Sequence, residues 1–199
     1  MFQDIEIIEE INDNNIFLRK ISKNDARFLF NSLKQREITN YMSLGPLKTL
    51  DSSKRLIGNY LKYWSKFSQY NYIIEIKEGN MIKKVGSISL WNISWLHMRA
   101  EIGIWIVPDY WKQGIGEKAI NLIKIIAFNH LKLNRLEAHV AVDNIRSITL
   151  FQKCEFIKEG ILKQYLNFNE IYHDALILAC LNIKKKRINK KGNCINSIF

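Results

Sequence analysis

The sequence contains few prolines, which interrupt helices and strands, and few cysteines, which can cross-link a chain. Its 199 residues include two prolines and no segment rich in Pro, Gly and Ser, which argues against a linker between domains. The three cysteines, Cys154, Cys180 and Cys194, are widely spaced, and this odd set predicts neither a disulfide framework nor a zinc motif. The four histidines also lack metal-ligand spacing such as His-Glu-x-x-His, so we expect no metal site.

Long apolar runs and a leader-like N-terminus are also missing. No apolar run reaches the ~18 residues of a membrane span, and the first residues contain neither a basic region nor an apolar one. We therefore expect no membrane partner and a cytoplasmic protein. The 47% apolar content supplies a packed core in a chain of this length, which excludes a wholly disordered protein.

The charge of the chain is positive and unevenly distributed. Lysine and arginine outnumber aspartate and glutamate by 30 to 19, for a net charge of +11. Six of these cations lie within residues 184–199, which contain no acidic residue, and the rest of the chain carries +5. Such a run can contact nucleic acid weakly or be a solvated, disordered end. We predict one domain over residues 1–183 and a basic, disordered tail over residues 184–199.

Apolar periodicity predicts alternating strands and helices. Alternation favours strands over residues 16–19, 72–76, 85–91, 99–107, 135–142, 156–160 and 172–181. Helical spacing favours helices over residues 25–34, over a segment capped by Asp51-Ser52-Ser53, over a long stretch after Gly116, and over residues 144–153. A strand–helix–strand–helix run flanked by hairpins predicts a mixed α/β sheet with helices on both faces.

The most informative stretch runs from Ile102 to Glu117, where a strand enters a turn with two glycines that opens a helix. The first amides of a helix lack internal partners and carry partial positive charge. Gly114 and Gly116 would let a ligand approach this backbone closely, so residues 113–118 could cradle a phosphate group. The glycine spacing alone also fits a plain tight turn, and neither the dinucleotide fingerprint nor a P-loop is present.

Three motifs in register resemble the GNAT acyltransferase superfamily, and in particular its ribosomal-protein N-terminal acetyltransferases. Residues 110–116 (YWKQGIG) resemble the acetyl-CoA loop, whose pattern is Gln/Arg-x-x-Gly-x-Gly/Ala. Residues 143–160, with DNIRS, FQKCEF and EG, and residues 172–174, YHD, agree in order and spacing. The resemblance covers residues 84–181 approximately and implies a mostly antiparallel sheet of six to seven strands.

The resemblance also implies where acetyl-CoA binds. In such proteins the strand before the loop splays from its neighbour, and the pantetheine arm of the co-substrate lies in the gap. The strand would flank the arm, the loop would hold the pyrophosphate, and Asn144 would contact the arm, although asparagine also favours a helix N-cap. The expected cofactor-binding residues are Ile104, Trp105, Ile106, Val107, Lys112, Gln113, Gly114, Ile115, Gly116, Glu117, Lys118 and Asn144.

One departure from the family pattern bears on catalysis. Phe151 stands where many superfamily members keep a tyrosine acid, and a phenyl ring cannot donate a proton. A thiol has an ordinary pKa of ~8.5, so a thiolate can leave without that acid. Ser147 could replace the tyrosine, since the ribosomal-protein branch places a serine near the thioester sulfur. It could also be an ordinary residue of a first helical turn.

Two strands offer a general base. Alternation puts Glu101 on the same face as Gly103 and Trp105, and some superfamily members use a glutamate from this strand. His139 falls where certain relatives carry a glutamate, and a histidine can accept a proton near neutral pH. Leu166 stands where another type of relative has its base, so that route is absent. Glu101 and His139 could each instead be half-exposed strand residues without a catalytic role.

We expect an N-acetyltransferase that transfers an acetyl group from acetyl-CoA to the N-terminal α-amine of a protein, by direct attack in a ternary complex. An α-amine, with a pKa of ~7.7–8.0, needs less help from a base than a lysine amine at ~10.4. Two different functions stay open. One is acetylation of a small amine, namely an amino sugar nucleotide, a polyamine or an aminoglycoside. The second is a non-catalytic acyl-CoA-binding or RNA-associated module. An exposed last strand could also pair two copies into a homodimer.

Overall fold

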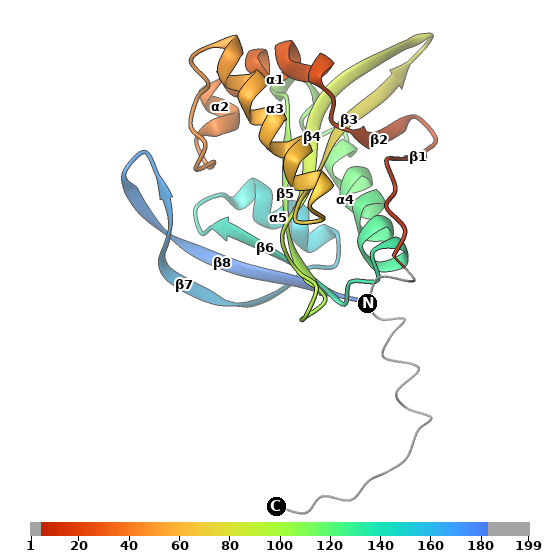
Figure 1. Ribbon diagram of the computed structural model, residues 1–199. Coiled ribbons are helices and arrows are strands. Elements are labelled where there is room, and N and C mark those ends of the chain that lie inside the picture. The colour runs from red at the N-terminus through yellow and green to blue at the C-terminus, as the bar shows by residue number, and fades with distance from the viewer. Residues whose placement is uncertain (1–4, 183–199) are drawn as a thin grey trace, which may run out of the picture.

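The computed structural model describes residues 5–182, and one sheet of eight strands forms its centre (Figure 1). The strand order is β1-β2-β3-β4-β5-β6-β8-β7, and the neighbours are antiparallel except β5 and β6. The strands are β1 (Glu10–Asp13), β2 (Ile16–Lys20), β3 (Tyr70–Glu78), β4 (Met81–Ser94), β5 (Arg99–Ile106), β6 (Arg135–Ala141), β7 (Ile157–Phe168) and β8 (Ile171–Leu181). The predicted mixed, mostly antiparallel sheet is confirmed, with more strands than the six to seven expected.

Helices cover both faces of this sheet, as the sequence predicted (Figure 1). One face of the sheet is covered by α1 (Ala26–Leu33), α2 (Arg36–Thr39) and α3 (Leu50–Ser65). The opposite face carries α4 (Ile115–Ile125), continued by a π-helical turn (Ile126–His130), and α5 (Ile145–Lys153). Short 3-10 turns (Lys23–Asp25 and Pro108–Tyr110) precede α1 and the glycine loop.

Alternation along β5 lets one strand serve both faces. Ala100 and Ile102 are buried in the core that includes Ile120 of α4. Trp105 points the other way and stacks on Phe28 of α1, with ring centroids 5.7 Å apart. Side chains on one face of β5 therefore pack into the core beneath α4. Side chains on its other face point toward the layer formed by α1 to α3.

Several elements differ from the sequence prediction, and the short α2 was not predicted at all. α3 is capped by Thr49, whose Oγ1 accepts a hydrogen bond from the Ser52 amide at 3.1 Å, because the three residues predicted as the cap already lie within the first turn. β7 extends to Phe168, well beyond its predicted end, because it pairs with β8 up to the turn that joins them. β1 was not predicted, since its four residues show no apolar alternation and are held by pairing with β2.

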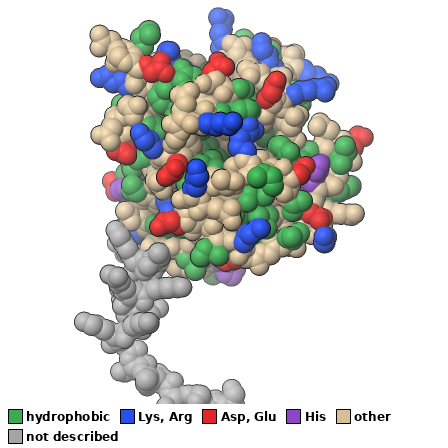
Figure 2. All heavy atoms as spheres, turned by 180° about the vertical axis from the view of Figure 1, so that it is seen from behind, with side chains coloured by type: hydrophobic (Ala, Val, Ile, Leu, Met, Phe, Trp, Pro, Cys, Tyr) green, Lys and Arg blue, Asp and Glu red, His purple; other side chains and the backbone are tan. Residues whose placement is uncertain are grey.

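The outer surface carries charges of both signs. Figure 2 shows basic and acidic side chains interspersed over the face that it displays. No helix within residues 5–182 is long and apolar enough to cross a membrane. The predicted tail, residues 184–199, lies outside the described residues, and the domain boundary before it stays a prediction.

A buried carboxylate, Asp25, ties β2 and β4 to the first helices. Its oxygens accept hydrogen bonds from Arg19 at 2.8 and 2.9 Å and from Lys84 at 2.6 Å. The amide and hydroxyl of Ser22 also donate to it, at 2.8 and 3.1 Å. Burial alone would raise the pKa of Asp25, but these hydrogen bonds outweigh burial and hold the pKa well below its usual range. The folded state therefore binds the ionised form strongly.

Replacing Asp25 with Asn should lower the free energy of unfolding by about 3–5 kcal/mol at neutral pH, because Arg19 and Lys84 lose their shared counter-ion. Since the pKa is depressed in the folded state, this stabilisation is present above the unfolded carboxyl pKa of ~3.9 and is lost as the pH falls below it. Denaturant unfolding at pH 7 and pH 3 should show the difference between parent and variant shrinking in acid. Asp51→Asn, which removes an exposed carboxylate beside Lys54, is the control. An equally large loss of unfolding free energy in Asp51→Asn would contradict the role given to the buried Asp25 carboxylate.

Candidate active site

β5 and β6 pair over only three residues of each strand. The parallel register joins Arg99–Glu101 with Arg135–Glu137 and stops there, although β5 continues to Ile106 and β6 to Ala141. The two strands therefore diverge and leave a gap between them. The splaying of this strand from its neighbour, which the family resemblance implied, is confirmed.

Backbone groups of β5 point into this gap without a strand partner. The Val107 amide donates to the Val85 carbonyl at 2.8 Å, so alternate residues from Val107 backward face β4. The amides of Ile104 and Ile106 consequently face the gap. This edge of β5 can therefore pair with an extended ligand as a neighbouring strand would.

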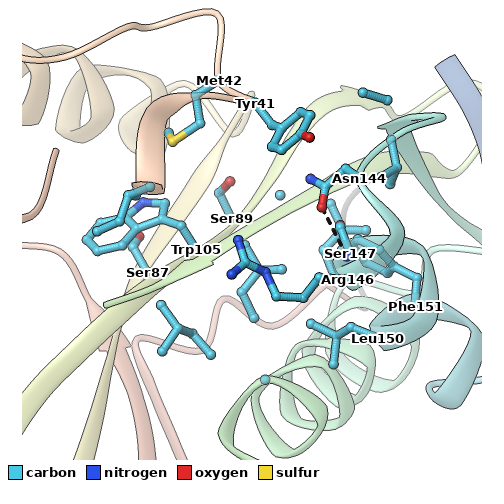
Figure 3. Close-up of a pocket in the computed structure, with 18 of the residues that line it drawn as sticks. Tyr41, Met42, Ser87, Ser89, Trp105, Asn144, Arg146, Ser147, Leu150 and Phe151 are labelled. Carbon is cyan, nitrogen blue, oxygen red and sulfur yellow. Dashed lines mark hydrogen bonds between the residues drawn. The ribbon is translucent and has the colours of Figure 1, made fainter. Parts of the chain in front are cut away.

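A cavity of about 920 Å³ reaches both faces of the sheet at this gap (Figure 3). We call the part on the α4 side the loop half; it is lined by Ile102, Ile104, Ile106, 110–112, 114–117, Val140, 144–147, 149–151 and Lys153. We call the part on the side of α1 to α3 the aromatic half. It is lined by Leu29, Leu33, Glu37, Ile38, 41–44, Tyr60, Gln69, Asn71, Ser87, Ser89, Trp91, Glu101, Gly103, Trp105, His139, Ala141, Tyr165, Leu166 and Phe168.

The glycine loop presents unpaired amides to the loop half. Gly114, in the left-handed region at φ +77°, is the N-cap of α4 and has no side chain to cap the helix. Among the described residues, no backbone carbonyl accepts from the amides of Gly114 to Glu117. A Cβ on Gly116 would lie 3.0 Å from the Leu150 side chain, so the glycine keeps the groove between α4 and α5 open. Unpaired amides at the positive end of a helix suit a phosphate group.

Trp111 fixes one wall of the loop half. Its Nε1 donates to the Ile106 carbonyl oxygen at 2.6 Å, and the guanidinium of Arg146 lies 3.6 Å from the centroid of the indole. Arg146 itself extends from α5 into the cavity (Figure 3). The indole thereby connects β5, the glycine loop and α5.

Asn144 caps α5 and also lines the loop half. Its Oδ1 accepts a hydrogen bond from the Ser147 amide at 3.2 Å (dashed in Figure 3), which confirms the expected helix cap. Ser147 and Phe151 are four residues apart on α5, and both line the cavity. Phe151 is buried against Phe156, with ring centroids 5.0 Å apart. The Ser147 hydroxyl is thus a polar group beside the position that the phenyl ring occupies.

The cavity wall contains most of the predicted cofactor-binding residues, namely Ile104, Trp105, Ile106, Lys112, Gly114, Ile115, Gly116, Glu117 and Asn144. Val107, Gln113 and Lys118 do not line it. The Val107 amide is bonded to β4, and the Gln113 side chain turns back to donate to the Asp109 carbonyl at 2.9 Å. The Lys118 amide donates to the Gly114 carbonyl at 3.2 Å, as the first internal bond of α4. The structure gives these three residues no contact with the cavity.

The two candidate bases form one pair in the aromatic half. Nδ1 of His139 lies 3.2 Å from Oε2 of Glu101, and Nδ2 of Asn92 donates to Oε1 at 2.5 Å. Glu101 is only 3% exposed. Burial alone would raise the pKa of Glu101, but the hydrogen bonds from His139 and Asn92 outweigh burial, and the pKa lies below its usual value. Glu101 is therefore ionised at neutral pH.

This pairing gives the two nitrogens of His139 different roles. An ionised carboxylate only accepts hydrogen bonds, so Nδ1 carries the proton and Nε2 is left as an acceptor. Tyr165 of β7 packs edge-on against the imidazole, with ring centroids 5.1 Å apart. His139 can take a proton at Nε2 while the carboxylate of Glu101 stabilises the resulting imidazolium.

Sequence reasoning missed several residues of the aromatic half. The rings of Tyr41 and Phe168 meet edge to face, 6.2 Å apart, and join the loop after α2 to the β7–β8 hairpin. Ser87 and Ser89 line the cavity from β4. The alternation of these serines with apolar residues along the strand could have predicted that they share a face. No local sequence pattern could have predicted the contact between Tyr41 and Phe168. Trp91 and Tyr165 also line the aromatic half.

Charged side chains are divided unequally between the two halves. The aromatic half has the carboxylates of Glu37 and Glu101, and none of its described lining residues is Lys or Arg. The loop half has three cations and one carboxylate: Lys112, Arg146, Lys153 and Glu117. The loop half is therefore suited to an anion, and the aromatic half to an apolar ligand that carries positive charge.

Comparison with known proteins gives a consistent family. Residues 15–157 match the acetyltransferase (GNAT) domain. YoaA of Bacillus subtilis, an uncharacterized N-acetyltransferase, is 28% identical over 164 residues, which are 82% of this chain and 92% of YoaA. Spermidine N-acetyltransferase from Vibrio cholerae, solved in complex with CoA and spermine, has a TM-score of 0.75 at 27% identity, covering 85% of this chain and 96% of that one.

A further solved structure resembles this chain in fold alone. RimL, a ribosomal L7/L12 α-N-protein acetyltransferase in complex with coenzyme A, has a TM-score of 0.79 at 20% identity, with 87% of this chain and 98% of that chain covered. The geometry described above fits acetyl-CoA, because the open amides at Gly114 to Glu117 suit its pyrophosphate and the gap beside Ile104 and Ile106 suits an extended arm. The chain belongs to the GNAT acetyltransferase family and is an acetyl-CoA-dependent N-acetyltransferase.

Proposed function

We propose that this enzyme acetylates the α-amino group at the N-terminus of a protein or peptide. The observation that carries the proposal is the lining of the aromatic half. It surrounds the Glu101–His139 pair with aromatic, aliphatic and uncharged polar side chains, and its described lining residues include no Lys or Arg. Such a surface suits one protonated amine attached to an apolar chain.

The chemistry of the base supports the same acceptor. An ordinary imidazole has a pKa of ~6.5, about 1–1.5 units below an α-ammonium and about 4 units below a lysine-type ammonium. Each unit corresponds to ~1.4 kcal/mol, so deprotonating the lysine-type amine would cost roughly 4 kcal/mol more. As a base, an ordinary imidazole is therefore better matched to an α-amine than to an aliphatic amine.

In this proposal the loop half binds acetyl-CoA, which supplies the acetyl group as a thioester. The ammonium first gives a proton to Nε2 of His139. The neutral nitrogen then bonds to the acetyl carbon as the carbon–sulfur bond breaks, and the second proton of the nitrogen passes to the departing thiolate. The Ile106 amide faces the gap and could donate to the acetyl oxygen, whereas the Val107 amide is already bonded to β4. The Ser147 hydroxyl could donate a hydrogen bond to the departing thiolate.

A polyamine is the second candidate acceptor. Glu37 adds a second carboxylate to the aromatic half, and a polyamine carries further ammonium groups along its length. The Vibrio cholerae relative, described as acting on spermidine, is 28% identical over 172 residues, or 86% of this chain and 96% of the relative. One further carboxylate, in a lining whose other side chains apart from the Glu101–His139 pair are uncharged, supports this acceptor less well than it supports a peptide.

Sugar-derived acceptors and a non-catalytic role have less support. An amino sugar nucleotide would bring phosphates into the aromatic half, where no described lining residue is Lys or Arg. An aminoglycoside carries several ammonium groups, and the aromatic half offers only two carboxylates among its described lining residues to pair with them. Nucleic-acid contact would depend on residues 184–199, which lie outside the described residues, and a cytoplasmic location and a homodimer stay predictions. A non-catalytic module would leave the Glu101–His139 pair without a role.

Acceptor preference tests the proposal directly. Initial rates with acetyl-CoA should be measured for a peptide with a free N-terminus and apolar first residues, for the same peptide blocked at its N-terminus but containing lysine, and for spermidine. We expect kcat/KM for the free peptide to exceed the other two at least ~10-fold, a difference of ~1.4 kcal/mol. Faster acetylation of spermidine would overturn the proposal in favour of the polyamine.

The glycine loop gives a prediction about co-substrate binding. Gly116→Trp should weaken acetyl-CoA binding at least ~100-fold, because even a Cβ would contact Leu150 and an indole would fill the groove. Calorimetric titration measures this affinity. Gly58→Trp, on the exposed side of α3 where nothing lies within 4 Å of the added Cβ, is the matched control and should bind like the parent. Parental affinity in Gly116→Trp would mean that the co-substrate binds elsewhere.

The base assignment gives a prediction about rate and pH. His139→Gln should lower kcat by ~10²–10⁴-fold, because glutamine cannot accept a proton, while acetyl-CoA affinity stays near the parental value. Acidification should slow both the parent and the variant, because the acceptor amine itself becomes protonated. Glu101→Gln should retain more activity than His139→Gln. A parental kcat in His139→Gln would remove this residue from the proton path.

A further inference from the structure

Arg146 occupies an electrostatically unfavourable place on α5. It lies in the first turn, where the helix dipole is positive and a cation is disfavoured, and that turn contains no acidic residue. Its side chain is exposed to solvent and has no ion-pair partner among residues 5–182. The stability of the helix therefore gives no reason for an arginine here. The position instead suits a residue that meets an anion from outside the chain.

The side chain is nevertheless held in a defined place. Its guanidinium lies 3.6 Å from the centroid of Trp111, and the indole is fixed in turn by the 2.6 Å hydrogen bond from Nε1 to the Ile106 carbonyl. Stacking uses the face of the guanidinium plane and leaves the N–H groups at its edge able to donate. The side chain projects from α5 into the cavity (Figure 3).

The surroundings of this guanidinium define the ligand. It lines the loop half together with the unpaired amides of Gly114 to Glu117 and with Lys112 and Lys153. Glu117 lines the same half but forms no ion pair with Arg146. A planar donor fork beside a helix N-terminus suits the oxygens of a phosphate group.

We propose that Arg146, stacked on Trp111, is a side-chain ligand for a phosphate group of acetyl-CoA. The proposal rests on acetyl-CoA binding in the loop half. The backbone amides of the glycine loop would contact the anion from one side of the groove. Arg146, which extends from α5, would contact it from the other side. The residue would thereby make the enzyme prefer CoA thioesters over thioesters that lack phosphate. Acetyl-CoA contains a pyrophosphate and a ribose 3′-phosphate, and both offer the same chemistry to a guanidinium.

Calorimetric titrations of CoA, 3′-dephospho-CoA and pantetheine into the parent chain and Arg146→Gln test this role. Arg146→Gln should weaken CoA binding by roughly 10–100-fold, the usual effect of losing hydrogen bonds between charged groups. Pantetheine, which has no phosphate, should bind both proteins alike. A loss that persists with 3′-dephospho-CoA assigns Arg146 to the pyrophosphate, and a loss confined to CoA assigns it to the 3′-phosphate.

Two further variants separate a specific contact from general charge. Arg55→Gln removes one positive charge from the exposed surface of α3 and should bind CoA like the parent. Arg146→Lys keeps the charge without the planar fork and should recover only part of the affinity. Parental CoA binding by Arg146→Gln would overturn the proposal, as would an equal loss for pantetheine, which would make Arg146 a support for the groove. A parent chain that fails to bind CoA would overturn the co-substrate site as well.

Discussion

β5 and β6 hydrogen-bond to each other only as far as Glu101 and Glu137, and backbone groups in the middle of a sheet are rarely left without partners. Beyond that point the edge of β5 is open, and the sheet has a passage from one face to the other. The α4 face supplies the amides of a helix N-terminus, and the opposite face supplies an ionised carboxylate and its histidine. Without the divergence of these strands the two sets of groups would be separated by the sheet itself.

The passage also separates two electrostatic environments over a short distance. The loop half collects cations around unpaired amides, and the aromatic half contains carboxylates but no described Lys or Arg. In the proposed reaction, an anionic donor would be attracted to the loop half and a protonated acceptor to the aromatic half, so neither would compete well for the place of the other. The reacting groups would then meet at the gap, where Ile106 of β5 and His139 of β6 lie on its two sides.

The sequence was informative where the site is local and less so where it is assembled from distant segments. The glycine loop and Asn144 were identified because their motifs are continuous. Glu101 was assigned to a strand face by alternation and His139 was identified by resemblance to relatives, but their 3.2 Å contact depends on a parallel register that neither signal specifies. Phe168 could not be placed against Tyr41, because β7 was predicted to end earlier and the pair is separated by most of the chain.

That edge-to-face contact between Tyr41 and Phe168 bears on how such an enzyme can change over evolutionary time. The loop half is built from one continuous stretch of the chain, from β5 to α5, whereas the outer wall of the aromatic half joins a segment near the N-terminus to a hairpin near the C-terminus. Substitutions in either outer segment can reshape the entrance without disturbing the binding of the donor. Acceptor preference can therefore diverge between lineages while the donor site is inherited unchanged, and a shared fold is a poor guide to which amine a given member selects.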